Sequence, residues 1–270
     1  MKHPPCILTI AGSDSGAGAG IQADLKTIAA LGGYGLSVIT ALTAQNSSGV
    51  TGIFAPPPEF VKLQLETVLS DFPVAAAKTG MLFSSPIITA LSGILKNKTF
   101  PLVVDPVCVS QSGHRLLEPD AVQALCREML PLADLMTPNR PEAELLTGIK
   151  IDGPNDVASA LEKLLSLGPK AVLLKGGHFK GQTMVDWLGR PGTPPVALEQ
   201  PRVDTKNTHG TGCTLSAGIA TGLGHGLDLR QAVVQAQEYL NLALEKSYAP
   251  GKGCGPPNHL APMFGPRPKN

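Results

Sequence analysis

The chain has 270 residues, 43% of them hydrophobic and 16% charged, which is enough for one substantial core. A formal net charge of +1 gives no reason to expect nucleic acid or an acidic membrane surface as a partner. The sequence shows no apolar run of about 18 residues and no secretory signal pattern, so it predicts a cytoplasmic protein without a membrane segment. The five cysteines lack metal-ligand spacing, and we expect most of them to be reduced core residues.

Short apolar runs alternate with helical patterns along most of the chain. Such strands, separated by helices, are typical of a mostly parallel sheet covered on both faces. Strands are predicted at 6–12, 36–42, 74–80, 101–107, 133–139 and 170–177. Helices are predicted at 21–32, 58–72, 84–96, 141–147 and 154–166.

The pattern changes after the last of these strands. The sequence then predicts two short antiparallel strands at the sheet edge, 182–188 and 195–203. Two helices follow, at 211–224 and 228–246. The stretch from about 249 to 270 is rich in glycine and proline and is expected to be irregular. Because no repeat or linker is visible, residues 1–270 are predicted to form a single α/β domain with a three-layer α/β/α arrangement.

Small and polar residues gather where the predicted strands end. Ligands of open α/β sheets bind beyond the carboxyl ends of the strands, so these positions predict a binding site. The segments concerned are 12–20, 44–46, 78–81, Asp105, Asn139 and 175–178.

The stretch "AGSDSGAGAG" (11–20) joins the first strand to the first helix. It does not match the spacing G-x-G-x-x-G, and no G-x-x-x-x-G-K-[ST] occurs in the chain, which excludes a P-loop nucleotide site. Two interpretations stay open: a flexible turn, or a wall of the ligand site where Asp14 or Asp24 approaches a small molecule.

"TPNRPEAE" (137–144) places Asn139 and Glu142 three residues apart where a strand gives way to a helix. This spacing fits an N-cap and its capping-box partner. It fits equally well a pair of oxygen ligands for Mg²⁺ and its waters. Both interpretations stay open.

"KGGHF" (175–179) ends a strand with a cation and two glycines. Lys175 is either a strand-end lysine in a turn or a point charge for phosphate. His178 is interpreted as a structural histidine.

"DTKNTHGTGCTLSAGIA" (204–220) places Gly210, Thr211, Gly212 and Cys213 at the start of an apolar helix. A helix start offers unpaired N–H groups and a positive dipole end, which suit an anion. The same position is expected to lower the pKa of the Cys213 thiol toward neutrality, so that it can take a proton from an alcohol. The alternative is a buried thiol in helix packing.

These segments together resemble the ribokinase-like vitamin kinases, in particular the hydroxymethylpyrimidine/phosphomethylpyrimidine kinases of thiamine biosynthesis. The matching segments span nearly the whole chain in the order of the family: "AGSDSGAGAGIQADLKT", "TALTAQNSSGV", "AAKTGML", "VVDPV", "SGHRLL", "TPNRPEAELLTG", "LLKGGH" and "VDTKNTHGTGCTLSAGIA". The last is the most specific, because ribokinases usually have aspartate where the vitamin-kinase branch has cysteine.

The resemblance implies a ribokinase-like fold and a set of site residues. Gly210, Thr211, Gly212 and Cys213 would form the anion hole, with Cys213 also the catalytic base. Residues near the nucleotide would be Lys175, Asn139 and Thr211, and those supporting Mg²⁺ would be Glu142, Asp105 and Asn139. The pyrimidine site would be lined by Gln45, Asp24, Gly12, Met81 and Val107.

Physical chemistry supports two of these assignments. An aminopyrimidine presents an N–H donor beside a ring-nitrogen acceptor, and the carboxamide of Gln45 offers the complementary pair. Met81 would add a sulfur–ring contact to the flat face of the ring.

The implied activity uses ATP with Mg²⁺ to phosphorylate 4-amino-5-hydroxymethyl-2-methylpyrimidine and then its monophosphate. The nearest alternative is a pyridoxine or pyridoxal kinase, and a more distant one is a non-catalytic vitamin-binding sensor. The chain departs from the family at Gln111, where lysine is usual, which puts the efficiency of phosphate transfer in question. The resemblance also implies a homodimer, with no nucleic acid or membrane partner.

Overall fold

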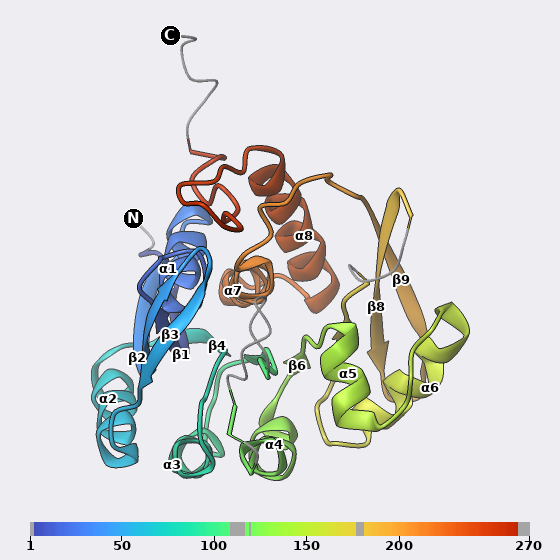
Figure 1. Cartoon of the computed structure of the whole chain (residues 1–270). Helices are drawn as coiled ribbons and strands as arrows, with labels where there is room; N and C mark the ends of the chain where they lie inside the picture. The colour runs from blue at the N-terminus through green and yellow to red at the C-terminus, as the bar shows by residue number, and fades with distance from the viewer. Residues whose placement is uncertain (1–2, 109–116, 119, 177–180, 264–270) are drawn as a thin grey trace, which may run out of the picture.

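The computed structural model describes residues 3–108, 117–118, 120–176 and 181–263. Within these residues one sheet of nine strands runs through the molecule (Figure 1). In sheet order the strands are β3 (Gly49–Phe54), β2 (Tyr34–Asn46), β1 (Cys6–Asp14), β4 (Val74–Thr79), β5 (Leu102–Val104), β6 (Leu135–Met136), β7 (Val172–Leu174), β8 (Thr183–Arg190) and β9 (Thr193–Pro201).

The middle of the sheet is parallel and both edges are antiparallel. Strands β2, β1, β4, β5, β6 and β7 pair in parallel, which confirms the predicted core. The antiparallel pair β8–β9 confirms the predicted edge. The second antiparallel edge, β3 against β2, was not predicted. Most residues of β3 are exposed, so the strand lacks the apolar run or alternation that reveals a strand in a sequence.

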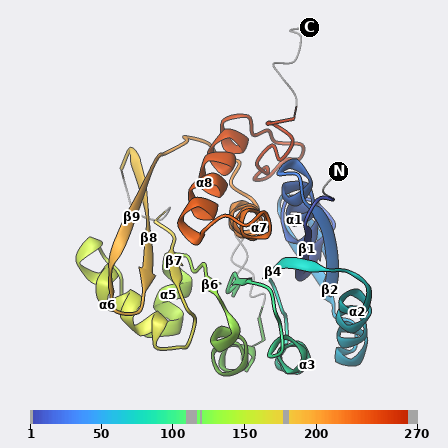
Figure 2. The ribbon, with the colours of Figure 1, turned by 180° about the vertical axis from the view of Figure 1, so that it is seen from behind.

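Helices cover the two faces of the sheet and complete the three-layer α/β/α arrangement (Figures 1 and 2). One face carries α1 (Gly20–Ala30), α7 (Thr211–Gly224) and α8 (Leu229–Glu245) over one apolar cluster. The other face carries a larger cluster. Its helices are α2 (Pro58–Asp71), α3 (Ser85–Leu95), α4 (Ala121–Ala124), α5 (Arg140–Thr147) and α6 (Pro154–Leu165).

The helical stretch that begins with α4 was also not predicted. It continues as the π-helical turn η1 (Leu125–Met129) and the 3₁₀ turn η2 (Leu130–Leu132). Pro131 has no N–H to donate to a regular α-helical ladder, and the helical stretch ends one residue later, at Leu132.

Helix α7 lies in the centre of its layer and is buried along most of its length. A helix that is apolar or small all round is a core helix. Its glycines allow this packing: a Cβ at Gly218 or Gly222 would lie 3.0 Å from the side chain of Ala236 or Ala232 on α8. The close α7–α8 contact fixes where the first turn of α7 points.

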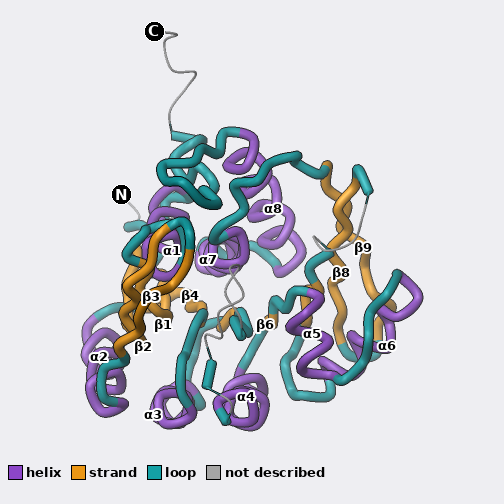
Figure 3. The backbone as a smooth tube through the Cα atoms, viewed as in Figure 1, coloured by secondary structure: helices purple, strands orange, loops and turns teal. Residues whose placement is uncertain are grey.

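The strand order changes direction at β1, because β2 lies on one side of it and β4 on the other. The loops that leave the carboxyl ends of β1 and β4 lead into α1 and α3, which lie on opposite faces of the sheet, whereas β2 turns directly into β3 (Figure 3). Such a switch point leaves a crevice beyond the strand ends. No helix within the described ranges is long and apolar enough to span a lipid bilayer.

Candidate active site

A pocket of about 610 Å³ lies beyond the carboxyl ends of the strands, bounded by the first turn of α7 and by α8. It brings together every predicted site residue except Asp24. Those lining it are Gly12, Gln45, Met81, Asp105, Val107, Asn139, Glu142, Lys175, Gly210, Thr211, Gly212 and Cys213.

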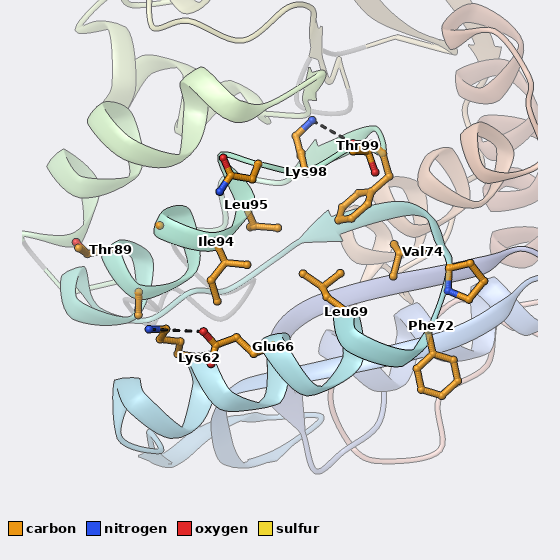
Figure 4. A pocket seen from close by; sticks show the side chains of 15 residues that line it. Lys62, Glu66, Leu69, Phe72, Val74, Thr89, Ile94, Leu95, Lys98 and Thr99 are labelled. Atoms are coloured by element: carbon orange, nitrogen blue, oxygen red, sulfur yellow. Dashed lines mark hydrogen bonds and ion pairs between the residues drawn. The ribbon is translucent and has the colours of Figure 1, made fainter.

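A second hollow of about 900 Å³ lies between α2 and α3 (Figure 4). Its walls are mainly apolar, and its charged groups are Lys62, Glu66 and Lys98. Lys62 and Glu66 form an ion pair of 3.6 Å, and Lys98 is paired with Asp134. None of the predicted site residues lies in this hollow, so it is not the candidate site.

The first turn of α7 forms one wall of the candidate site. Its N-cap, Gly210, has φ +84°, a left-handed conformation that favours glycine. A Cβ at Gly210 would lie 1.9 Å from the carbonyl oxygen of Gly18, so the α7 turn packs directly on the loop between β1 and α1. The N–H of Thr211 donates to the carbonyl oxygen of Thr208 at 3.4 Å, whereas the N–H groups of Gly212 and Cys213 have no intrahelical partners and are available to an anion.

Cys213 is half-buried in this turn, and its thiol does not behave as the sequence predicted. Burial raises the pKa of Cys213 to about 12, although Lys78 and the backbone N–H of Gly20 act to lower it. The predicted pKa near neutrality is therefore wrong. Desolvation of the sulfur outweighs the helix N-terminus, because the thiolate is the charged form and burial disfavours it.

Asp24 does not line the pocket, which makes the predicted ring contact wrong. Its side chain on α1 is fully buried, and both carboxylate oxygens accept from Lys78 Nζ at 3.0 Å. Thr9 Oγ1 also donates to Asp24, at 2.6 Å. A buried carboxylate needs such partners, and Asp24 uses its hydrogen-bonding capacity inside the core.

Lys78 lies next to the site, and no role was predicted for it from the sequence. It is fully buried at the end of β4. Burial acts to lower the pKa of Lys78, but Asp24, Cys213 and Asp105 together raise it, so the side chain stays cationic. A fixed positive charge near the first turn of α7 acts in the same direction as the helix dipole there.

Asp105 and Lys175 form an ion pair within the site. Asp105 Oδ1 accepts from Lys175 Nζ and from Thr137 Oγ1, both at 3.0 Å. A Cβ at Gly212 would lie 3.4 Å from both Lys175 Nζ and Asp105 Oδ2, so this charge pair lies against the α7 turn. The ion pair therefore places a cation and a carboxylate beside the predicted anion hole.

Asn139 and Glu142 form the capping box that one interpretation predicted. Asn139 Oδ1 accepts from the Glu142 N–H at 2.9 Å, and Glu142 Oε2 accepts from the Asn139 N–H at 2.8 Å. Both residues also line the pocket. Burial raises the pKa of Glu142 to about 7, with Lys175 acting against it. A capping role thus does not remove Glu142 from the site.

Gln45 lies beside His209, a residue that the sequence did not single out. Its carboxamide contacts Thr43 and His209, and His209 Nε2 lies 2.9 Å from Asp14 Oδ2. Asp14 accepts backbone N–H groups of the β1–α1 loop, including Gly16 and Ala19. Burial acts to raise the pKa of Asp14, but His209 and these N–H groups lower it overall. The position of His209 directly before the glycine turn was the only signal in the sequence.

Two other predictions fall on parts of the chain that the structure does not describe. Gln111 and His178 both lie outside the described residues.

The pocket, the glycine turn and the fold can be compared with known proteins. The sequence profile described as phosphomethylpyrimidine kinase matches residues 14–258. The chain belongs to the phosphomethylpyrimidine kinase family. Membership makes it a kinase and confirms the family predicted from the sequence motifs.

Individual relatives agree with this assignment. The hydroxymethylpyrimidine/phosphomethylpyrimidine kinase of Rhizobium meliloti is 50% identical over 94% of this chain and 96% of its own. The chain also spans about half the length (52%) of the thiamine biosynthesis bifunctional protein ThiED of Geobacter sulfurreducens, at 49% identity over 94% of this chain.

Solved structures share the fold over most of the chain. Phosphomethylpyrimidine kinase of Clostridium difficile is 44% identical, with a TM-score of 0.77 over 87% of this chain and 97% of its own. Pyridoxal kinase of Bacillus subtilis, solved as an ADP complex, is 35% identical, with a TM-score of 0.87 over 96% of this chain and 98% of its own. The predicted ribokinase-like vitamin-kinase fold is confirmed.

Proposed function

We propose that this family member transfers the γ-phosphoryl group of ATP to the hydroxymethyl oxygen of 4-amino-5-hydroxymethyl-2-methylpyrimidine, and then phosphorylates the resulting monophosphate. The observation that carries the proposal is that one pocket brings together Gln45, the α7 turn with Cys213, and the Lys175–Asp105 ion pair. Gln45 contacts His209, which directly precedes the turn, and a Cβ at Gly212 would lie 3.4 Å from both Lys175 Nζ and Asp105 Oδ2.

The pocket matches the charge that phosphoryl transfer develops. The transferring group spreads negative charge over its oxygens, and preorganised N–H groups and cations stabilise that charge. The free N–H groups of Gly212 and Cys213 at the start of α7 are the preorganised donors, and Lys175 is the cation. Gly12, Met81 and Val107 line the pocket with Gln45 and would bind the ring.

Oxygen ligands for Mg²⁺ line the same pocket. Asp105 and Glu142 offer carboxylates, and Asn139 offers an amide oxygen. Among the described residues, no group of three or more His, Cys, Asp or Glu side chains could hold a metal ion alone. This donor set fits Mg²⁺ held by one or two carboxylates together with nucleotide phosphates and water. The bound ion would neutralise phosphate charge, and it would favour the ionised form of Glu142, whose pKa is raised to about 7 by burial.

The two steps make different demands on a proton acceptor. An alcohol keeps its proton until transfer is under way, whereas a phosphate ester has a second pKa of about 6 and needs no base at neutral pH. Cys213 is assigned to the first step, next to the α7 N-terminus and Lys78. Because the free thiol has a raised pKa, the sulfur becomes a base only when its ionisation accompanies substrate binding.

ADP release with four acceptors tests the proposal: hydroxymethylpyrimidine, its monophosphate, pyridoxine and pyridoxal. We expect the two pyrimidines to have the highest kcat/KM. Turnover restricted to pyridoxine and pyridoxal would overturn the pyrimidine assignment, while the assignment as a kinase would stand.

Pyridoxal phosphorylation is the second candidate, because the structural agreement with the pyridoxal kinase of Bacillus subtilis extends over 96% of this chain. The same assay decides between the two rings. The proposal also includes a cytoplasmic location and a homodimeric state. Light scattering of the purified protein would measure the number of subunits.

A further inference from the structure

The carboxamide of Gln45 is held at both ends by neighbouring side chains. Its Oε1 lies 3.1 Å from Thr43 Oγ1, and its Nε2 lies 3.3 Å from His209 Nε2. The oxygen and nitrogen of a carboxamide occupy almost the same volume, so only the surrounding donors and acceptors decide which end is which. Exchanging the two ends would move no other atom.

The hydroxyl of Thr43 has one hydrogen to give. Thr43 Oγ1 lies 2.9 Å from the carbonyl oxygen of Ser13, which can only accept. With that hydrogen donated to Ser13, an oxygen of Gln45 facing Thr43 would meet a lone pair. A nitrogen of Gln45 in the same place would instead donate to Thr43 Oγ1, and every group would be satisfied.

The other end of the carboxamide gives the same answer independently. His209 Nε2 lies 2.9 Å from Asp14 Oδ2, a carboxylate that also accepts the N–H groups of Gly18 and Ala19. Since Asp14 is ionised, His209 Nε2 must carry a hydrogen. That single hydrogen serves Asp14, so a Gln45 nitrogen facing His209 Nε2 would set two donors against each other, whereas a Gln45 oxygen would share the hydrogen with Asp14 and oppose no donor.

We propose that Gln45 is held with its nitrogen toward Thr43 and its oxygen toward His209, and that Thr43 and His209 are thereby positioning residues that set the hydrogen-bond pattern accepted by the site. One N–H and one lone pair of the carboxamide remain for a ligand. Their order along the amide edge is fixed by two side chains that need not touch the ligand.

This inference rests on the proposed function and deepens it. A 4-aminopyrimidine offers an amino donor beside the N3 acceptor, while its 4-oxo analogue offers an oxygen acceptor beside an N3–H donor. In one ring pose, each fits only one orientation of the Gln45 carboxamide. A fixed carboxamide therefore selects the amino ring with its hydroxymethyl group directed at the α7 turn, and a carboxamide free to turn over would admit the oxo ring in the same pose.

The test compares kcat/KM for 5-hydroxymethyl-2-methylpyrimidine carrying a 4-amino or a 4-oxo group. In Thr43→Val the amide nitrogen loses its acceptor, and we expect the amino-to-oxo ratio to fall about fivefold, which corresponds to one hydrogen bond of about 1 kcal/mol. The KM for ATP should not change. Thr43→Ser restores the hydroxyl and should restore the ratio. Thr43→Ala provides a second variant if valine does not fit.

Thr51→Val is the matched control. Thr51 lies on β3 outside the pocket, and its Oγ1 donates to the carbonyl oxygen of Ala44 at 2.9 Å. Losing that bond disturbs the same β2–β3 hairpin but leaves Gln45 held, so the ratio should stay at the wild-type value.

Three outcomes overturn the inference while the function stands. They are an unchanged ratio in folded Thr43→Val and Thr43→Ala, an equal fall in Thr51→Val, and a failure of Thr43→Ser to restore the ratio. A wild-type enzyme that phosphorylates neither pyrimidine instead rejects the proposed function, and the inference with it.

Discussion

At the scale of single residues, the chemistry of the site depends on how far burial shifts the pKa values of its side chains. Cys213 lies at a helix N-terminus beside a cationic Lys78, yet its pKa is raised to about 12 by desolvation. Lys78 itself forms a fully buried ion pair with Asp24. The chemical role of Cys213 therefore depends on what bound substrate does to the electrostatics of the pocket.

Replacing Cys213 with alanine separates the two proposed reactions. We expect phosphorylation of the alcohol to fall by about 10²–10⁴, the usual contribution of a positioned acid or base, and phosphorylation of the monophosphate to fall much less. Single-turnover rates with each acceptor make the comparison. Equal losses would show that Cys213 packs the anion hole and takes no proton.

The raised pKa of Cys213 predicts slow alkylation in the free enzyme. Only the thiolate reacts, so at neutral pH iodoacetamide should modify Cys213 roughly a thousandfold more slowly than the same residue in the unfolded chain. Mass spectrometry of the peptide over a pH series measures the rate, which should still be rising steeply at about pH 10.5, where an ordinary thiol is already ionised. A plateau at or below that pH would contradict the raised pKa.

At the scale of elements, the first turn of α7 depends on a backbone shape that only glycine provides easily. Gly210 combines a positive φ with close contact to Gly18, so the α7 N-terminus and the β1–α1 loop fix each other. That contact aligns the helix N–H groups with the pocket.

Gly210→Ala should therefore lower kcat/KM by about 10–100-fold, since left-handed backbone in a residue with Cβ costs about 1–3 kcal/mol and the Cβ also clashes. Gly192→Ala is the control. Gly192 has φ +71° with nothing within 4 Å of its Cβ position, in the β8–β9 turn. We expect it to lower Tm but keep activity, and equal activity losses in both variants would reject the alignment role.

At the scale of the whole molecule, the segment that follows α8 connects distant parts of the fold. Its described part, residues 249–263, has no helix or strand, as predicted. His259 is nevertheless buried, with its Nε2 3.0 Å from Thr214 Oγ1 on α7 and its carbonyl accepting from Tyr239 on α8 at 2.8 Å. The segment therefore contributes to stability.

Acid should weaken the protein through His259. Burial, assisted by Lys26, lowers the pKa of His259 to about 4, below its ordinary 6.5. Between those values the unfolded chain binds more protons, so about 3 kcal/mol of stability present above pH 6.5 is lost as the pH falls to 4. Urea unfolding of wild type and His259→Gln should show the gap between them closing over this range, and parallel curves would contradict the assignment.

Most of the architecture was predictable because strong periodic patterns specify elements locally. The parallel strands, the long helices and the β8–β9 edge followed from apolar runs and turn residues. β3 and the stretch from Ala121 to Leu132 did not, because one is mostly exposed and the other is broken by irregular turns.

The sequence by itself determined the family, the order of elements and the cluster of residues at the strand ends, since these follow from local pattern and motif. Only the tertiary structure decided that Asp24 pairs with Lys78, 54 positions away, and that Gln45 meets His209, 164 positions away. It also decided the state of Cys213. The free energy of a charge or hydrogen bond depends on desolvation and on partners from distant parts of the chain, and local pattern contains neither.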